Sequence, residues 1–307
     1  MTSADASLLV IAGPTASGKT GLAIEVAKRL DAEIISADSQ QVYRWFDIGT
    51  AKPSAAELAA VPHHLISFVD PLEPEFSAMR WARHADEAIA AIRARGKRVV
   101  IAGGTGLYLR ALLHGLVDAP SRDDELRDEL EAFADANGNE ALHARLRIVD
   151  PKSAEKLEVA DRLRVIRALE IHTLTGKPAS QHREEHAFLP DRHAYELFVL
   201  TPPDREALYG AINRRTQAMF DAGLVEETRA LVGKGYREAA PMKAVGYVQA
   251  LSVVDGSLSL EQAIADTAQA TRHYAKRQLT WFKKEKGAQP IEPTGALEQI
   301  LKVRTRT

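Results

Sequence analysis

Residues 7–20 read SLLVIAGPTASGKT, and this stretch decides the fold. Residues 7–12 form a short apolar run that is typical of a buried parallel strand, and the mostly apolar residues 20–30 predict a helix. Between them, GPTASGKT satisfies the pattern G-x-x-x-x-G-K-[ST]. Its glycines allow backbone N–H groups to turn inward around an anion, while the helix N-terminus and Lys19 add positive charge. The stretch therefore predicts a loop that binds a diphosphate or triphosphate, and nothing in it specifies ATP.

Apolar runs and amphipathic stretches alternate in the residues that follow. Residues 33–36, 65–69 and 99–102 predict further strands, and residues 81–95 predict a helix that ends at Gly96. Strands that alternate with helices indicate a doubly wound parallel sheet of the α/β class, here P-loop NTPase-like. Such sheets bind their ligands at the carboxyl ends of the strands.

The pattern changes in the middle of the chain. From residue 121 to about residue 176 the sequence shows helical periodicity only, and a strand returns at residues 192–200, followed by helices. A helical block between two strands of one sheet predicts an insertion domain. We therefore expect an α/β core with C-terminal helices in residues 1–117 and 193–307, and an inserted all-helical domain in residues 118–192.

The composition excludes several classes of protein. Hydrophobic residues make up 45% and charged residues 27% of the 307 residues, close to a globular average, so fibrous and wholly disordered chains are excluded. The absence of cysteine excludes disulfides and thiolate metal sites and fits a reducing compartment. No apolar run approaches the ~20 residues of a membrane span, and the first residues carry no basic secretory signal. We expect a cytoplasmic protein without a membrane partner.

The net charge of −2 hides an uneven distribution. Residues 1–117 carry 12 basic and 12 acidic side chains, residues 118–192 carry 12 and 17, and residues 193–307 carry 16 and 13. Residues 272–286 hold six basic side chains and one acidic residue, Glu285. A polyanion would therefore approach this face rather than the whole surface, although a solvated helix face has the same composition.

Polar residues follow two other predicted strands on the same rim as the phosphate loop. Asp38 lies just beyond the second strand, where a carboxylate can bind Mg²⁺, act as a base or cap a helix. Gly103 and Gly104 close the fourth strand and allow a ligand to approach the backbone closely. The hydroxyl of the next residue, Thr105, can contact a phosphate.

Eight motifs of the chain occur in a characteristic order. They are GPTASGKT (13–20), DSQQVY (38–43), DIGTAKP (47–53), PHHLI (62–66), GGTGLY (103–108), RVIRALE (164–170), TGKP (175–178) and TRHYAKRQLTWF (271–282). In this set the chain resembles the tRNA dimethylallyltransferase family (tRNA isopentenyltransferases), in its bacterial form. The resemblance extends from about residue 8 to residue 285.

The resemblance implies a reaction and its partners. Family members transfer a dimethylallyl group from dimethylallyl diphosphate to N6 of adenosine 37, beside the anticodon of certain tRNAs, and release diphosphate. The expected partners are the tRNA anticodon stem-loop and dimethylallyl diphosphate, with Mg²⁺ as cofactor, and we expect a monomer. The phosphate loop would then hold the diphosphate leaving group instead of the phosphates of ATP.

The resemblance also assigns the diphosphate site. Arg215 matches a family arginine that contacts the diphosphate, and Thr20 is placed to bind Mg²⁺. Ala211 stands where relatives often carry another arginine, so the number of diphosphate-contacting arginines stays open. The residues expected to bind the diphosphate are Gly13, Pro14, Thr15, Ala16, Ser17, Gly18, Lys19, Thr20 and Arg215.

Two residues match catalytic positions of the family. Asp38 matches the general base that takes a proton from the attacking amine, and Thr105 matches a threonine at the reacting centre. The target base must leave its stack to reach a buried carbon, and Ser39, Gln40 and Gln41 would hold it or its neighbours. The residues expected to bind tRNA are Asp38, Ser39, Gln40, Gln41, Thr105, Arg127, Leu163, Arg164, Val165, Ile166, Arg167, Met242, Lys243, Ala244, Val245, Gly246 and Tyr247.

The insertion raises a question of charge. We expect Arg164 and Arg167 to contact tRNA phosphates, whereas Leu163 and Ile166 also look like core residues. Because the insertion has more acidic than basic residues, its acidic side chains must face away from the RNA.

Three other functions fit parts of the sequence. A small-molecule kinase would explain the phosphate loop, the α/β core and a helical lid, and would leave the basic C-terminal helix without a role. A prenyltransferase that acts on free AMP or ADP would use the same donor. A nucleotide-dependent RNA-binding switch would need no catalysis at all.

Overall fold

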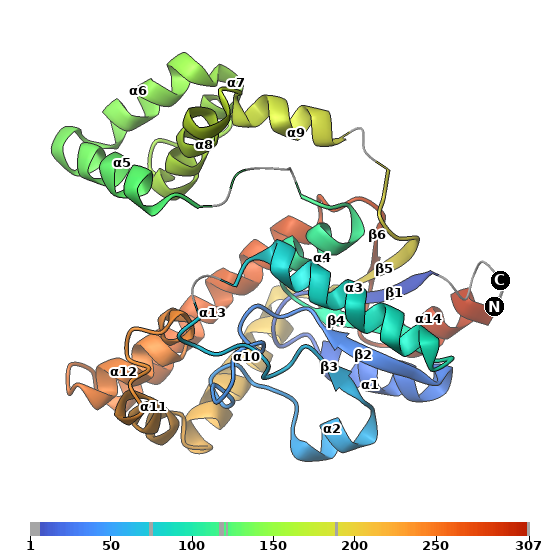
Figure 1. The fold of residues 1–307 in the computed structure, drawn as a ribbon. Coiled ribbons are helices and arrows are strands. Elements are labelled where there is room, and N and C mark those ends of the chain that lie inside the picture. The colour runs from blue at the N-terminus through green and yellow to red at the C-terminus, as the bar shows by residue number, and fades with distance from the viewer. Residues whose placement is uncertain (1–6, 74–75, 117–119, 121, 188–189, 306–307) are drawn as a thin grey trace. The chain divides into compact units, whose positions relative to one another are not determined.

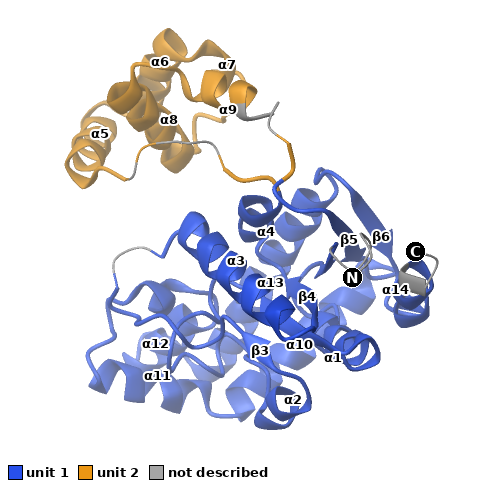
Figure 2. Ribbon diagram, turned by 45° about the vertical axis from the view of Figure 1, so that its right-hand side comes forward, with its two compact units in different colours: residues 1–113, 192–307 blue, residues 114–191 orange. Residues whose placement is uncertain are grey.

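The chain folds into two compact units (Figure 2). Unit 1 comprises Met1–Leu113 and Arg192–Thr307, and unit 2 comprises His114–Asp191; sequence reasoning set the insertion at residues 118–192. The computed structural model describes residues 7–73, 76–116, 120, 122–187 and 190–305. Each unit is considered separately below.

The centre of unit 1 is a six-stranded sheet in which every pair of neighbouring strands is parallel. The strand order is β3-β2-β4-β1-β5-β6 (Figure 1). This arrangement confirms the predicted doubly wound α/β fold. The strands are β1 Leu8–Ala12, β2 Ala32–Ser36, β3 His63–His64, β4 Arg98–Gly103, β5 Tyr195–Leu200 and β6 Ala288–Ile291.

Two strands differ from the prediction. The strand expected at residues 65–69 is wrong, because Leu65 and Ser67 have positive φ angles of 62° and 53°, which an extended strand does not allow. The strand lies just before them, and Val69 makes only an isolated bridge to Tyr43. The edge strand β6 was not predicted, because its four residues AQPI are short and contain proline, which only an edge position tolerates.

Both faces of the sheet are covered. Leu9 and Ile11 of β1 pack into a core with α1 (Lys19–Leu30) and α14 (Ala296–Thr305). Side chains alternate along a strand, so the equally buried Leu8 and Val10 face the other side, where α3 (Ala78–Ala94) and α4 (Gly106–Leu113) lie (Figure 1). Burial on both faces explains why the strands are continuous apolar runs instead of alternating patterns.

A group of C-terminal helices completes unit 1. The long helix α13 packs against α10 and α12 and also reaches α4 beside the sheet. Among the helices that the structure describes, none combines the length and the apolar character needed to cross a membrane. The remaining elements of unit 1 are α2 Ala55–Ala60, α10 Arg205–Asp221, α11 Leu224–Gly233, the 3₁₀ helix η2 Ala240–Lys243, α12 Tyr247–Val254 and α13 Leu260–Phe282.

All the regular secondary structure that is described for unit 2 is helical. Its core includes Leu130, Leu142, Leu146 and Leu169, which come from three of its helices. The imidazole Nδ1 of His114 and a carboxylate oxygen of Asp191 lie 2.8 Å apart, so the two ends of the insertion are joined. The helices are α5 Asp124–Asn137, α6 Asn139–Val149, α7 Pro151–Ala154, α8 Arg162–Thr175 and α9 Ala179–Ala187.

Candidate active site

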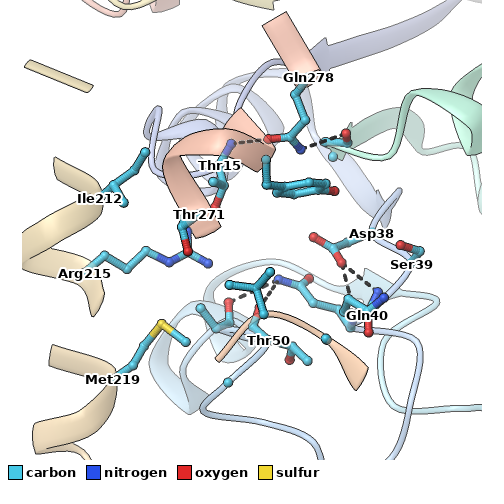
Figure 3. Close-up of a pocket in the computed structure, with 18 of the residues that line it drawn as sticks. Thr15, Asp38, Ser39, Gln40, Thr50, Ile212, Arg215, Met219, Thr271 and Gln278 are labelled. Carbon is cyan, nitrogen blue, oxygen red and sulfur yellow. Dashed lines mark hydrogen bonds between the residues drawn. The ribbon is translucent and has the colours of Figure 1, made fainter. Parts of the chain in front are cut away.

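A pocket of about 340 Å³ lies in unit 1 at the carboxyl edge of the sheet. Residues that follow β1, β2 and β4 form one side, and α10 and α13 form the other (Figure 3). In Figure 3, Ile212, Arg215 and Met219 of α10 lie across the pocket from Asp38 and Ser39. The site residues predicted from the sequence that line this pocket are Thr15, Lys19, Thr20, Asp38, Ser39, Gln40, Gln41, Arg215, Lys243, Ala244 and Val245.

The phosphate loop has the shape that its sequence predicts. Gly13 has a φ of +143°, and a Cβ added there would lie 2.7 Å from the carbonyl oxygen of Leu200, so glycine is required. Gly18 is left-handed with a φ of +86° and directly precedes α1. The Lys19 ammonium donates a 2.6 Å hydrogen bond to the carbonyl of Pro14, so the lysine folds back over its own loop.

Two cations share this part of the pocket without acidic partners. Burial, and then the nearby guanidinium of Arg215, lowers the pKa of Lys19 to about 7. Burial also lowers the pKa of Arg215, and the charge of Asp38 opposes both shifts. Neither cation forms an ion pair within the described part of the chain. An anion bound between them would relieve both the desolvation and the mutual repulsion.

The acceptor side of the pocket is built around Asp38. One oxygen of its carboxylate accepts the backbone N–H of Gln40 at 2.8 Å and that of Gln41 at 3.3 Å. The Thr105 hydroxyl oxygen accepts the N–H of Ser39 at 3.0 Å, which ties this turn to the loop after β4. Gly103 must be a glycine here, because a Cβ would lie 2.1 Å from the carbonyl oxygen of Ala37.

The two glutamines of the DSQQ turn differ. The Gln41 amide nitrogen donates to the carbonyls of Thr50 and Ala51, at 3.4 and 3.1 Å, and its oxygen accepts the Ser36 hydroxyl at 3.1 Å. The side-chain oxygen of Gln40, by contrast, is buried and has no hydrogen-bond partner in the described structure. Gln41 therefore holds protein segments together, and Gln40 keeps an acceptor for a substrate.

Helix α13 contributes residues that sequence reasoning missed. The Gln278 oxygen accepts the N–H of Thr15 at 2.8 Å, and its amide donates to the carbonyl of Gly104 at 2.9 Å. One buried side chain thus joins the phosphate loop to the loop after β4. Burial, and then the charge of Asp38, raises the pKa of Tyr274 to about 12. The signal was present in the motif TRHYAKRQLTWF, because Tyr274 and Gln278 are four residues apart and share a helix face.

The predicted tRNA-binding segment of α8 divides into two classes. Val165 and Ile166 are 1% and 2% exposed and belong to the core of unit 2, so their side chains offer no surface to RNA. Leu163 is 76% exposed, so its interpretation as a core residue is wrong; it lies in the first turn of the helix, off the buried stripe. Arg164 is also exposed, and among the described residues its ion-pair partner is Asp161, three positions earlier in the chain.

Arg127 and Arg167 have a structural partner. Both guanidinium groups bind the carboxylate of Glu170, which is completely buried and also accepts the N–H of Asp123 at 2.8 Å. Arg167 donates in addition to the carbonyl of Pro120. Their prediction as tRNA contacts stays a prediction, because the geometry also gives them a role inside unit 2.

The segment of residues 242–247, which was also predicted to bind tRNA, likewise contains both accessible and buried residues. Lys243, Ala244 and Val245 line the pocket, whereas Met242 and Tyr247 are buried beside it.

The donor atoms of the pocket fit Mg²⁺ bound together with a diphosphate. Among the described residues, no three His, Asp or Glu side chains are grouped as a metal site. Mg²⁺ characteristically takes one or two protein oxygens and completes its shell with water and phosphate oxygens. The Thr20 hydroxyl, at the start of α1, and the Asp38 carboxylate are oxygen ligands of this kind that line the pocket.

Comparison with known proteins places this pocket in a family. Residues 41–285 match the family model described as IPP transferase. The chain is 63% identical, over 93% of its length and 92% of the relative, to a tRNA dimethylallyltransferase of Myxococcus xanthus.

Two solved structures are also similar. The full-length tRNA isopentenylpyrophosphate transferase of Bacillus halodurans is 39% identical with a TM-score of 0.71, over 98% of this chain and 95% of that one. A eukaryotic dimethylallyltransferase acting on tRNA is 28% identical with a TM-score of 0.79, over 97% of this chain and 77% of that one. The chain therefore belongs to the IPP transferase family, the family of the tRNA dimethylallyltransferases.

Proposed function

We propose that this protein transfers a dimethylallyl group from dimethylallyl diphosphate to N6 of adenosine 37 in tRNA. Its family membership makes it a dimethylallyltransferase that acts on tRNA; the donor and the acceptor atom are the finer proposal. The observation that supports the proposal is that one pocket has two cations on one side and a carboxylate on the other. The cations are Lys19 and Arg215, which form no ion pair with a described residue, and the carboxylate is Asp38. The cations suit a leaving group that becomes anionic, and the carboxylate suits an amine that must lose a proton.

The cationic side suits the leaving group. Breaking the allylic C–O bond leaves its electron pair on the diphosphate, where negative charge develops. Lys19, Arg215 and the N-terminus of α1 would stabilise that charge, because they are already in place when it appears. Thr20 is the residue that we expect to hold Mg²⁺. When bound, the ion neutralises part of the diphosphate charge.

The carboxylate side suits the acceptor. As the bond from N6 to the allylic carbon forms, the exocyclic amine must lose one proton, and Asp38 is the base that lines the pocket. Thr105 holds the turn that carries Asp38 and would contact the substrate at the reacting centre. The free side-chain oxygen of Gln40 can accept a hydrogen bond from the second N–H of the amine.

The acceptor base must be extruded from its stack to enter the pocket. Bases in an unpaired anticodon loop can be extruded at lower cost than paired ones, which favours a loop adenosine as the target. Lys243, Ala244 and Val245 also line the pocket and would contact neighbouring nucleotides. Arg164, an exposed arginine of unit 2, is the residue that we expect to contact a backbone phosphate.

The test is to follow the label of ¹⁴C-dimethylallyl diphosphate. We expect label in unmodified tRNA, at adenosine 37 after nuclease digestion and mass spectrometry, and none in a tRNA with guanosine at that position. Label in free AMP instead of tRNA would overturn the acceptor, and ATP turnover without label in nucleic acid would overturn the reaction in favour of a kinase.

A further inference from the structure

One wall of the pocket is a loop without regular secondary structure. Gly49, Thr50 and Ala51 line the pocket from this loop, which follows the DSQQ turn. Its internal bonds are local: the Thr50 hydroxyl donates to the carbonyl of Phe46 at 2.7 Å, Ala51 N–H donates to the carbonyl of Ile48 at 2.9 Å, and the Lys52 ammonium donates to the Asp47 carboxylate at 2.7 Å. Ala51 has a positive φ of 47°, a conformation that costs free energy outside glycine. Something outside the loop must hold it in this shape.

The outside support is the carboxylate of Glu227 on α11. Three successive backbone N–H groups donate to it: Asp47 at 3.3 Å, Ile48 at 3.0 and 3.1 Å, and Gly49 at 3.4 Å. A carboxylate that accepts several N–H groups is an anion held in a backbone nest, and such charge-assisted bonds are stronger than neutral ones. Glu227 is 178 to 180 residues from this loop in sequence, and none of the eight motifs contains it.

Tyr247 strengthens the same support. Its hydroxyl donates to the Glu227 carboxylate and accepts the N–H of Gly49 at 3.2 Å. The tyrosine is fully buried, with its ring 4.9 Å from that of Phe46 in an edge-on contact. A Cβ on Gly49 would lie 2.4 Å from this ring, so the motif DIGTAKP requires glycine at this position. Burial, and then the charge of Glu227, raises the pKa of Tyr247, so the hydroxyl keeps its proton for the bond.

The support reaches the catalytic turn through Gln41. The carbonyls of Thr50 and Ala51 accept the Gln41 side-chain amide, and the Gln41 backbone N–H donates to Asp38. Hydrogen bonds and the backbone between them therefore connect Glu227, through the loop and Gln41, to Asp38.

We propose that Glu227 is a positioning residue for the acceptor side of the pocket, which it orders together with Tyr247 by holding residues 47–49. This role rests on the proposed function, because the acceptor side has a meaning only if a nucleoside amine is the acceptor. Glu227 is not among the residues that line the pocket, so we expect it to act on the substrate only through the loop that it holds. Its removal should therefore slow the transfer step without weakening the diphosphate site, which depends on Lys19 and Arg215.

The experiment compares Glu227→Ala with Glu226→Ala, its neighbour on α11. Glu226 is exposed and makes only a long 3.9 Å contact to Arg229, so it is a matched control. We expect Glu227→Ala to lower the single-turnover rate of dimethylallyl transfer to tRNA about 10- to 100-fold, the range of a misplaced catalytic group. The Kd for inorganic diphosphate should stay within about twofold of the wild-type value, and Glu226→Ala should match the wild type in both measurements.

Two further variants separate positioning from folding. Tyr247→Phe removes one hydroxyl and should lower the rate less than Glu227→Ala, and the double variant should be no slower than Glu227→Ala, because the two groups act through one network. Active-site titration with inorganic diphosphate corrects each rate for folded enzyme. An unchanged rate in Glu227→Ala, or an equal loss of diphosphate affinity, would overturn the positioning role.

Hydrogen exchange tests the support without any tRNA. Amide exchange of residues 47–49 should accelerate in Glu227→Ala and not in Glu226→Ala. If the amides of residues 47–49 still exchange slowly in Glu227→Ala, Glu227 does not hold this loop, whatever the activity of the variant. If exchange accelerates but the wild-type enzyme labels no tRNA, the proposed function has failed and the positioning role for that acceptor fails with it.

Discussion

The cations of the pocket in unit 1 and those of the helices in unit 2 differ in their partners. In unit 2, Arg127 and Arg167 bind the buried carboxylate of Glu170. In the pocket, Lys19 and Arg215 are half-buried, but within the described chain no ion pair compensates their charge. A buried cation with a protein partner stabilises the fold, whereas one without a partner is prepared for an anionic ligand.

The carboxylates show the same contrast. Glu170 is enclosed by its arginines, and burial alone would raise its pKa, but hydrogen bonds from Arg127, the Asp123 N–H and Arg167 hold the pKa below its ordinary value. Asp38 in the pocket accepts only backbone N–H groups and lines the cavity. The comparison therefore separates charged residues that maintain the fold from those available for chemistry, and five predictions test it.

The largest effect is expected at Asp38. Asp38→Asn keeps a side-chain oxygen to accept the N–H groups of Gln40 and Gln41, so the turn should persist, but the amide cannot take a proton. We expect the transfer rate to fall by about 10²–10⁴-fold, the usual contribution of a general base, with tRNA affinity nearly unchanged. Single-turnover labelling of tRNA measures the rate; if the variant stays fast, another group is the base.

Glu170→Gln should remove the charge that Arg127 and Arg167 bind in unit 2. It leaves two half-buried arginines opposite a neutral amide, and removal of one partner from a buried pair costs about 3–5 kcal/mol of unfolding free energy. Urea denaturation of the full chain measures it, and the diphosphate affinity of unit 1 should not change. The control is Glu184→Gln, because its pair with Lys152 is exposed and should contribute less than about 1 kcal/mol.

The Glu170 network also has a pH signature. Because the pKa of Glu170 is lowered on folding, its stabilisation is complete above the unfolded value of about 4.3 and is lost as the pH falls through the folded pKa. The difference in unfolding free energy between wild type and Glu170→Gln should therefore shrink in acid. A difference that is constant from pH 7 to pH 3 would show that the carboxylate charge does not stabilise unit 2.

The pH dependence of diphosphate binding tests the unpaired cation Lys19 in the pocket. With a pKa of about 7, Lys19 is partly neutral at neutral pH and must take up a proton when the anion binds. We expect the Kd for inorganic diphosphate to rise above pH 7 by up to about tenfold per pH unit, relative to Lys19→Arg, which stays charged. Calorimetry in buffers of different ionisation enthalpy would detect the proton; equal profiles for both proteins would contradict the assignment.

The smallest effect is expected at Arg164. Arg164 is exposed, and its ion-pair partner within the described chain is Asp161 of the same helix end, so it can contact a phosphate and Arg164→Ala should weaken tRNA binding a few-fold. The slope of log K against log salt should become shallower by about 0.7–0.9, the contribution of one phosphate contact. Arg127→Ala should mainly destabilise unit 2 instead. Equal losses of tRNA affinity in both variants would remove the distinction between paired and exposed arginines.

The parts of the molecule that could be predicted are those in which neighbouring residues cooperate. The phosphate loop is eight successive residues between a strand and a helix, so its glycines and lysine act together wherever the rest of the chain goes. The buried parallel strands were visible as apolar runs for the same reason. Residues 65–69 were wrongly predicted as a strand because an apolar run does not reveal the positive φ angles of Leu65 and Ser67.

Other site residues could not be predicted, because distance in sequence hides their partners. Gln278 joins two loops that lie 263 and 174 residues away, and Glu227 holds a loop about 180 residues away. Their types, an amide in a basic helix and a glutamate in an amphipathic one, are ordinary for exposed helix positions. Val165 and Tyr247 show the reverse: they lie in segments predicted to contact RNA, yet both are buried.

The sequence by itself determined the anion-binding loop, the parallel sheet and, through the order of its motifs, the family. Three features depended on the tertiary structure: which polar residues meet in the pocket, which arginines pair with Glu170, and which glutamine keeps a side-chain oxygen without a described partner. The physical reason is that backbone conformation and strand burial depend on local pattern, whereas the state of a charge depends on the groups that folding brings within a few ångströms.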